Sequence, residues 1–291
     1  MEIGIDSFAA SPKGHTDSVK AMQELLERIE LADQVGLDAF GIGEHYRKEF
    51  LDSAPSIILA AAAARTNSIR LTSAVTVLST SDPVRVFQNF ATIDLISNGR
   101  AEIVAGRGSF VDSFPLFGYN LSDYDDIFSE KLKLLLKIRD KEIINWSGRF
   151  RPPLREQAIY PRPVQAKLPI WLGVGGTLAS FARAGTLGLP LMVAVIGGQT
   201  HKFEPLVKLY LEMGKKAGFL KEELPVGLHS FGFVSNTMDE AIDIFYPRYA
   251  EVIASMNKER GWVAPSRKQF EAMAKDEKGA IVIGIPEEVA Q

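Results

Sequence analysis

Short apolar runs alternate with segments of helical period from one end of the chain to the other. This rhythm predicts parallel strands joined by crossover helices. The expected strands are the apolar runs Glu2–Asp6, Ala39–Gly43, Ile69–Leu78, Ala101–Ala105, Ile170–Val174, Leu191–Ile196, Val226–Val234 and Ala280–Gly284. The expected helices begin or lie at about Thr16–Val35, Pro55, Pro83–Ser97, Ile127–Arg139, Leu178–Leu187, His201–Ala217 and Met238–Met256.

Eight strand–helix units favour a closed (β/α)8 TIM barrel, an α/β fold, over an open doubly wound sheet. No Gly-x-Gly-x-x-Gly follows the first strand, which argues against a Rossmann domain. We therefore expect residues 1–291 to form a single barrel domain. The segment Gly284–Val289 has the pattern of an eighth helix, but the chain stops at Gln291. We expect the natural protein to continue beyond it, because the last strand otherwise lacks a covering helix.

Two segments interrupt the alternation and are expected as insertions. Ser109–Tyr124, after strand four, is aromatic and too long for an ordinary strand–helix loop. Glu142–Gln165, before strand five, contains the turn sequence Asn145–Phe150 and four prolines that exclude a helix, so it predicts a hairpin. The aromatic side chains of the first insertion form either an apolar lid or the packing of the loop itself; they are Phe110, Phe114, Phe117 and Tyr119.

Composition narrows the possible partners. The chain is 46% hydrophobic and 24% charged, as globular proteins are. Its formal net charge of −3 gives no electrostatic indication of binding to nucleic acid or to an anionic membrane. The absence of cysteine removes disulfides, thiolate nucleophiles and cysteine-ligated metals. The first residues lack a signal-peptide pattern, and no apolar run reaches the roughly 18 residues of a membrane span. We expect a cytoplasmic protein.

In a barrel the chemistry lies where the strands end and the following loops begin. The four histidines are scattered along the chain, so no metal site is expected, and no lysine stands at a strand end to form a Schiff base. The strand ends carry glycines, an arginine, a histidine and aromatic residues instead. This lining suits a large, flat, phosphorylated cofactor.

His45 follows Glu44 at the end of the second strand. Its ordinary pKa range makes histidine the natural general acid or base, although a lone histidine is as often a structural hydrogen-bonding group. Glu44 either orients this imidazole or caps the loop.

Two loops have the residues of a phosphate site. Gly175, Gly176 and Thr177 precede a helix whose first amides can bind an anion, and Arg107 offers a planar fork between two glycines. Each has a plainer interpretation, as packing glycines or as a surface arginine. Because the loops after strands four and five are neighbours in a barrel, we expect them to share one phosphate.

The chain resembles the bacterial luciferase-like family. The resemblance runs in order along essentially the whole chain, through Gly41–His45, Leu78–Arg85, Asp94–Arg100, Gly106–Gly108, Pro169–Trp171, Gly175–Gly176 and Gly284–Val289. It implies a (β/α)8 barrel that binds FMN, or in one branch the deazaflavin F420, at the mouth. It also implies that both insertions lie near that mouth.

The resemblance also assigns roles to single residues. His45 matches the active-site histidine, and Ala74–Val75 matches a dipeptide with a non-prolyl cis peptide beneath the flavin ring. Arg107 and the Gly175–Thr177 loop match phosphate contacts. We add Phe8, after the first strand, to the expected cofactor contacts, together with Ala74 and Val75.

Some positions depart from the family pattern. Many members have two consecutive histidines where this chain has His45 and Tyr46, and the luciferase α subunit has cysteine where Gly106 stands. These departures put light emission and an aldehyde substrate in doubt, but not flavin binding.

The sequence therefore predicts an FMN-dependent oxidoreductase, a monooxygenase that uses reduced FMN and O2 on a small organic substrate. A separate reductase would supply the reduced flavin, and a homodimer is a family expectation. Two alternatives stay open on the same fold: an F420-dependent hydride-transfer enzyme, and a flavin-binding protein without turnover. An unrelated barrel hydrolase is disfavoured by the missing metal ligands and lysine.

Overall fold

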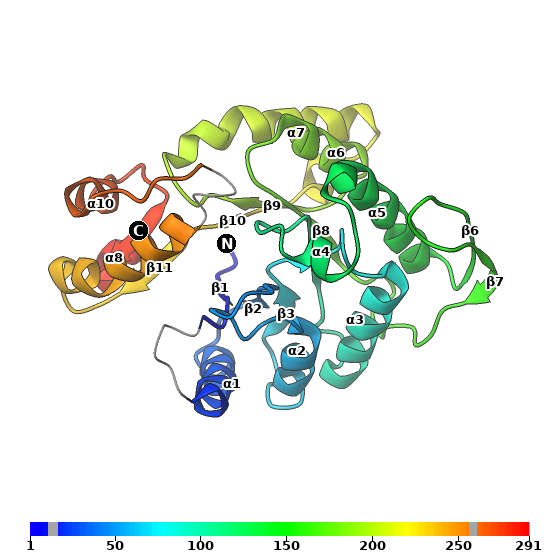
Figure 1. The fold of residues 1–291 in the computed structure, drawn as a ribbon, viewed down its shortest axis with the longest axis horizontal. Coiled ribbons are helices and arrows are strands. Elements are labelled where there is room, and N and C mark those ends of the chain that lie inside the picture. Colours follow the sequence, from blue (N-terminus) through cyan, green and yellow to red (C-terminus); the bar gives the residue numbers. More distant parts are fainter. Residues whose placement is uncertain (11–16, 256–260, 291) are drawn as a thin grey trace. The chain divides into compact units, whose positions relative to one another are not determined.

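The computed structural model describes residues 1–10, 17–255 and 261–290 (Figure 1). By its internal contacts the chain divides into two compact units, residues 1–173 and 174–291, and each is described by itself. The expectation of a single domain stays a prediction.

The first unit contains parallel strands in two groups. One sheet has the order β1-β2-β3, while β4 pairs with β5 and β5 with β8. These strands are β1 (Gly4–Ser7), β2 (Ala39–Ile42), β3 (Arg70–Ser73), β4 (Thr76–Val77), β5 (Ile103–Gly106) and β8 (Ile170–Val174), which ends at the boundary of the unit. The expected strand Ile69–Leu78 is thus two strands, separated by Ala74–Val75. That peptide bond is cis, which confirms the expectation from the resemblance.

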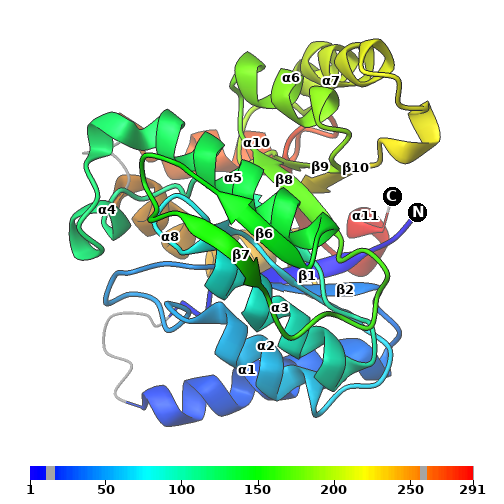
Figure 2. The ribbon, with the colours of Figure 1, turned by 90° about the vertical axis from the view of Figure 1, so that its right-hand side faces the viewer.

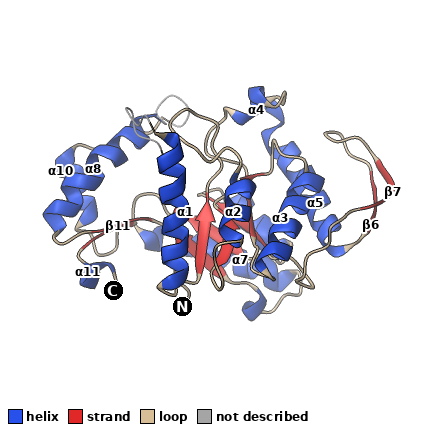
Figure 3. Ribbon diagram, turned by 90° about the horizontal axis from the view of Figure 1, so that it is seen from below, coloured by secondary structure: helices blue, strands red, loops and turns tan. Residues whose placement is uncertain are grey.

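The long helices of the first unit succeed one another beside the sheet (Figure 3). Contacts join α1 to α2, α2 to α3 and α3 to α5. The helices are α1 (Ser18–Gln34), α2 (Pro55–Ala63), α3 (Pro83–Ser97), the short α4 (Ser113–Leu116) and α5 (Tyr124–Asp140). The expected start of the first helix, at Thr16, lies outside the described residues, and Asp17 caps α1 by accepting from the Lys20 amide at 2.9 Å.

Local signals set the bounds of α3. The Asp82 carboxylate accepts hydrogen bonds from the amides of Val84 and Arg85, at 2.9 and 3.2 Å, and Pro83 occupies the first turn. The helix stops at Asn98, whose φ of 56° is left-handed. These are the bounds that the sequence predicts.

Arg100 joins three elements just after α3. Its guanidinium donates to the carbonyl oxygens of Ser97, Ile69, Ala63 and Thr66 at 2.6 to 3.2 Å. The end of α2, the start of β3 and the end of α3 are therefore held together by one side chain. Carbonyls that a helix end leaves without partners are satisfied in this way.

Both expected insertions contain regular structure. The segment after β5 holds α4 and the 3-10 turn η1 (Leu121–Asp123), so it is less irregular than expected, and α5 begins at Tyr124 rather than at Ile127. The second insertion is the predicted hairpin, formed by antiparallel β6 (Ile143–Trp146) and β7 (Leu154–Ala158). Figure 2 shows this hairpin alongside α5.

The second unit also alternates strands and helices. Strand β9 pairs in parallel with β10, and β11 pairs in parallel with β12. Its main elements are α6 (Leu178–Thr186), β9 (Leu191–Ala194), α7 (Glu204–Lys216), β10 (Val226–His229), β11 (Phe231–Val234), α8 (Met238–Ser255), α10 (Arg267–Ala274), β12 (Ile281–Gly284) and α11 (Pro286–Val289).

Two expectations for this unit need correction. The expected strand Val226–Val234 breaks at Ser230, because its first half pairs with β9 and its second half with β12. The polar stretch before Lys278 contains a helix that was not expected, α10, which Ser266 opens with a capping box. The expected end of α8, at Met256, lies outside the described residues. In the described part of the chain, no helix is long and apolar enough to cross a membrane.

Candidate active site

His45 follows β2 and is enclosed by phenylalanine rings. Phe50 stacks on the imidazole with ring centroids 4.3 Å apart, while Phe8 and Phe110 approach it edge-on at 4.9 and 5.5 Å. The side chain is 11% exposed. Phe8, an expected cofactor contact, thus lies against the expected catalytic histidine.

Asp52 fixes the orientation of this imidazole. Its fully buried carboxylate lies 2.9 Å from His45 Nδ1 through Oδ2 and accepts the His45 amide through Oδ1 at 3.1 Å. A carboxylate accepts only, so Nδ1 carries the proton in this bond, and Nε2 is the nitrogen left for a ligand. No residue in the described ranges hydrogen-bonds Nε2. His45 is therefore arranged to take or give a proton through Nε2.

Glu44 has a different role from Asp52. It accepts a hydrogen bond from the Tyr46 hydroxyl and another, at 2.9 Å, from the Val77 amide. Burial raises the pKa of Glu44, and burial also raises that of Tyr46, assisted by the adjacent Glu44. The hydrogen bond that orients the His45 ring comes from Asp52 and not from Glu44. The glutamate instead ties the end of β2 to β4.

Val75 inserts its side chain between two glycines. A Cβ at Gly106 would overlap Val75 Cγ2, and a Cβ at Gly173 would lie 2.8 Å from Cγ1. Ala74 is buried, and a Cβ at Gly41 would lie 3.1 Å from the Ala74 Cβ. The cis peptide between Ala74 and Val75 is thus packed against β2, β5 and β8.

The aromatic residues of the first insertion have unlike surroundings. Phe110 lies against His45 and beneath the Arg47 guanidinium, 3.9 Å from its ring centroid, and Arg47 also donates to Asp112 at 2.7 Å. Phe117 is half exposed and meets the Tyr46 ring edge-on at 5.1 Å. Phe114 is buried. Phe110 therefore belongs to the site, while Phe114 packs the loop.

Sequence reasoning missed Lys131, on α5. Its side chain is buried, its Nζ donates to the Ser79 carbonyl at 2.8 Å, and the ammonium lies 4.0 Å from the ring centroid of Tyr119. Burial lowers the pKa of Lys131 to about 8, against the opposing influence of Asp82 and Glu130. The signal was its position four residues after buried Ile127, on the apolar face of α5.

Asp52 was missed as well. It lies in the loop between β2 and α2, seven residues after His45. No periodicity applies to a loop of this kind, so its sequence position gave no signal of the contact.

Arg107, an expected phosphate contact, already has partners in the first unit. Its guanidinium is paired with Asp125 and lies 5.0 Å from the ring centroid of Tyr124. The side chain is 22% exposed. A phosphate bound by Arg107 would therefore share the guanidinium with Asp125 or displace it.

The other expected phosphate contacts belong to the second unit. Gly175, Gly176 and Thr177 are exposed, and a Cβ at either glycine would meet nothing within 4 Å. Thr177 is the N-cap of α6, but its side chain makes no capping hydrogen bond. The first amides of α6 therefore lack a side-chain cap. The two glycines before the helix have no side chains, so a ligand can approach the backbone there closely.

The described ranges hold no group of three or more histidines and carboxylates placed to bind a metal ion.

Comparison with known proteins gives concordant results. The family described as luciferase-like monooxygenase matches residues 1–291. The F420-dependent glucose-6-phosphate dehydrogenase of Amycolatopsis mediterranei is 29% identical over 205 residues, covering 67% of this chain and 61% of that enzyme. The chain spans about three fifths of the length of such curated relatives.

Solved structures agree over nearly the full chain. The monooxygenase RslO1 of Streptomyces bottropensis has a TM-score of 0.84 at 24% identity, covering 99% of this chain and 86% of that one. The oxygenating constituent of 3,6-diketocamphane monooxygenase of Pseudomonas putida, in complex with FMN, has a TM-score of 0.76 at 18% identity with the same coverages. At these identities the likeness shows the fold, and it confirms the expected (β/α)8 TIM barrel.

Proposed function

This chain belongs to the luciferase-like monooxygenase family, and from that premise we propose that it is an FMN-dependent monooxygenase. The proposed substrates are O2 and a small organic molecule. The observation that carries the proposal is the pair formed by His45 and Asp52, because it presents one imidazole nitrogen from an apolar enclosure.

The chain's own residues fit a flavin phosphate. The uncapped first turn of α6, behind Gly175 and Gly176, offers amides to an anion, and the absence of side chains lets a phosphate come near. Ala74, Val75 and Phe8 stay our proposed contacts to the ring. Reduced FMN, when bound, would supply the electrons that activate O2.

The remaining chemistry falls to the protein. His45 would hold or move a proton at Nε2, while Asp52 keeps Nδ1 protonated and the ring in place. Phe8, Phe50 and Phe110 would exclude water from that nitrogen. The substrate itself would be positioned by residues beyond this group.

F420-dependent hydride transfer is the second candidate. It is favoured by the relative of 29% identity, whose name specifies F420. The distinction lies in the cofactor, because the same barrel carries both chemistries among its neighbours.

Titration of the protein with FMN and with F420, each in oxidised and reduced form, tests the proposal. We expect saturable binding of FMN, weaker binding of riboflavin, and consumption of O2 when reduced FMN and a substrate are present. Tight F420 binding with no FMN binding would transfer the function to the second candidate. Flavin binding without turnover of any substrate would indicate a non-catalytic flavoprotein. The separate reductase, the homodimer and the cytoplasmic location stay predictions from the sequence.

A further inference from the structure

The second unit contains an apolar pocket that is lined by none of the residues assigned above to the candidate active site. It follows the end of β9 and has a volume of about 420 Å³, within the range usual for small-molecule sites. Its walls are Ile196, Ile253, Trp262, Val263, Pro265 and Met273.

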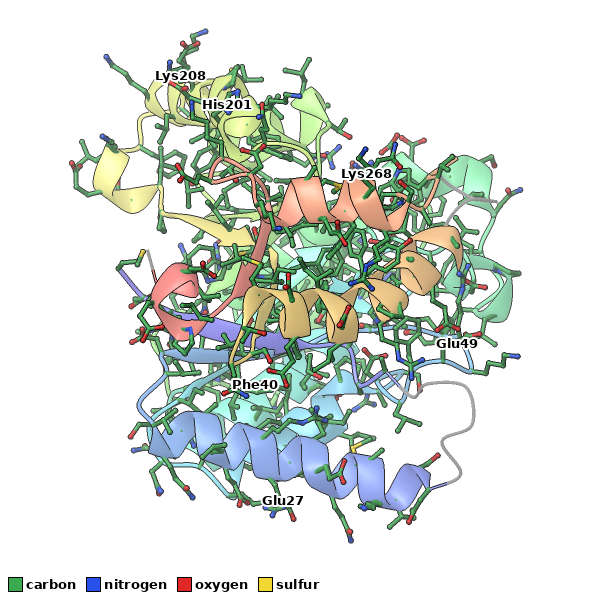
Figure 4. All side chains as sticks on the ribbon, turned by 90° about the vertical axis from the view of Figure 1, so that its left-hand side faces the viewer. Glu27, Phe40, Glu49, His201, Lys208 and Lys268 are labelled. Carbon is green, nitrogen blue, oxygen red and sulfur yellow. The ribbon has the colours of Figure 1, made fainter. Side chains whose placement is uncertain are left out.

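The walls of this pocket are held by contacts outside it. The Tyr246 hydroxyl donates to the Pro265 carbonyl at 3.1 Å and so fixes the segment that carries Trp262. Ile253 belongs to a buried cluster with Phe270, which joins α8 to α10. Figure 4 shows these two helices side by side, with Lys268 labelled on α10. The pocket is therefore built on packed elements.

Two lining side chains carry a hydrogen-bond donor, the hydroxyl of Tyr249 and the indole N–H of Trp262. The Tyr249 side chain is 6% exposed, and its ring is fixed edge-on against Phe231 at 5.4 Å and beside Phe270 at 5.0 Å. Its hydroxyl forms no hydrogen bond with any residue of the described ranges. Burial raises the pKa of Tyr249, so the hydroxyl keeps its proton and can donate.

No charged side chain is among the lining residues. A phosphate or carboxylate placed there would lose its hydration without gaining a counter-charge, which is strongly unfavourable. An apolar body with one oxygen acceptor would bury its surface against the walls and accept a hydrogen bond from the Tyr249 hydroxyl. We propose that this pocket binds a small uncharged molecule with an apolar ring or chain and one carbonyl or hydroxyl oxygen.

The ligand of this pocket would be the organic substrate of the proposed monooxygenase. In naming that substrate class, the inference rests on the proposed function. A phosphorylated sugar, the substrate named for the F420-dependent relative, does not fit the pocket. As a binding site the pocket stands independently of flavin. The two ideas can therefore fail separately.

Calorimetric titration of the full chain with indan-2-one, and with indane as its oxygen-free counterpart, tests the proposal. We expect saturable one-to-one binding of both, with indan-2-one the tighter. Tyr249→Phe should weaken indan-2-one by about two- to tenfold, the value of one neutral hydrogen bond, and leave indane unchanged. Tyr160→Phe, which removes an exposed hydroxyl in the first unit, is the matched control and should change neither.

Gly197→Leu supplies a second, blocking variant. Gly197 lines the pocket, a Cβ there meets nothing within 4 Å, and its φ is not positive, so leucine should fold without strain and fill the space. We expect loss of binding of both probes with an unchanged melting temperature. Unchanged binding in Gly197→Leu, no saturable binding by the unaltered protein, or displacement of indan-2-one by glucose 6-phosphate would each overturn the inference.

FMN binding is measured on the same samples to separate the two proposals. Probe binding without FMN binding would support the pocket and remove the proposed function. FMN binding without probe binding would leave the proposed function and remove the pocket.

Discussion

At the scale of single residues, one carboxylate determines which nitrogen of His45 faces a ligand. Replacing Asp52 by asparagine keeps the shape of the side chain but offers an amide that can also donate. The opposite imidazole tautomer then becomes favourable, with Nε2 protonated and unable to accept. Asp52 is on this view a positioning residue, which acts on the reaction through His45.

Asp52→Asn should therefore lower kcat by about 10²-fold or more, while KM and FMN affinity change little. His45→Ala sets the limit of the effect, roughly 10²–10⁴-fold for a lost general acid or base. The pH dependence of kcat should also move in Asp52→Asn, which a purely structural residue would not cause. Asp140→Asn, on the surface of α5, is the control. Loss of FMN binding and of thermal stability in parallel with kcat would assign Asp52 to the fold instead.

Arg107 illustrates competition between an internal partner and a ligand. Its guanidinium is already paired with Asp125, so a phosphate would share the guanidinium with that carboxylate or displace it. A charge-assisted hydrogen bond contributes about 1.5–3 kcal/mol, which corresponds to roughly tenfold to a hundredfold in affinity.

Arg107→Ala should accordingly weaken FMN by about that factor and leave riboflavin, which has no phosphate, almost unchanged. Asp125→Asn should strengthen FMN, because the guanidinium loses its competing partner. Equal loss for both flavins would mean that Arg107 supports the fold or the ring. Fluorescence titration gives the dissociation constant of each of the two variants for FMN and for riboflavin, to be compared with the wild-type values.

At the scale of the element, α5 contains a charge on its buried face. Lys131 joins the helix to the carbonyl of Ser79 and to the ring of Tyr119. Because its pKa is about 8 in the folded protein and near 10.5 in the unfolded chain, the unfolded chain binds more protons between these values. The free energy of unfolding therefore rises with pH between about 8 and 10.5. Below pH 8 the lysine is charged in the folded protein, and the free-energy cost of burying that charge is fully present.

Lys131→Met should remove that pH dependence. At about 1.4 kcal/mol per pH unit, the wild type should gain about 3 kcal/mol between pH 7.5 and 10.5 relative to the variant. Urea unfolding at a series of pH values measures the difference. Lys133→Met, two residues along and exposed to solvent, should keep the wild-type slope. Parallel curves for the wild type and Lys131→Met would contradict the titration of a buried lysine.

At the scale of the whole molecule, the elements that could be predicted are those set by local signals. The bounds of α3 follow from Asp82, Pro83 and Asn98, which act within a few residues of the helix ends. The hairpin of β6 and β7 follows from its turn sequence and prolines. Alternation of strands and helices along the chain predicted the α/β class, and the eight strand–helix units favoured the barrel, which the resemblance also implied.

What could not be predicted depends on partners distant in the chain. The break between β10 and β11 arises because the two halves pair with different strands, which no local pattern records. The helix α10 was missed because it has only eight residues, too short a segment for a helical period to stand out within a polar stretch. In the site, His45 was foreseeable from its place after a strand, but Asp52 was not, because its contact depends on the path of a loop.

The contact between Val75 and Gly106 leads to a prediction about paired substitutions. Gly106→Cys adds a Cβ where Val75 already stands, and overpacking of this kind costs about 1–3 kcal/mol. Val75→Ala removes the methyl groups that overlap, so the double variant should recover part of the loss. A double-mutant cycle of the free energy of unfolding measures the coupling. Simple additivity of the two changes would show that the strands shift to make room.

The same contact constrains how related sequences can diverge. A lineage that acquires a larger residue at the position of Gly106 while keeping valine at that of Val75 passes through a less stable protein. A lineage that shortens the residue at 75 first loses the packing of two methyl groups and leaves a cavity, so it also passes through a less stable protein. Among descendants of a common ancestor, large residues at 106 should therefore be found together with small ones at 75, and mixed combinations should be rare.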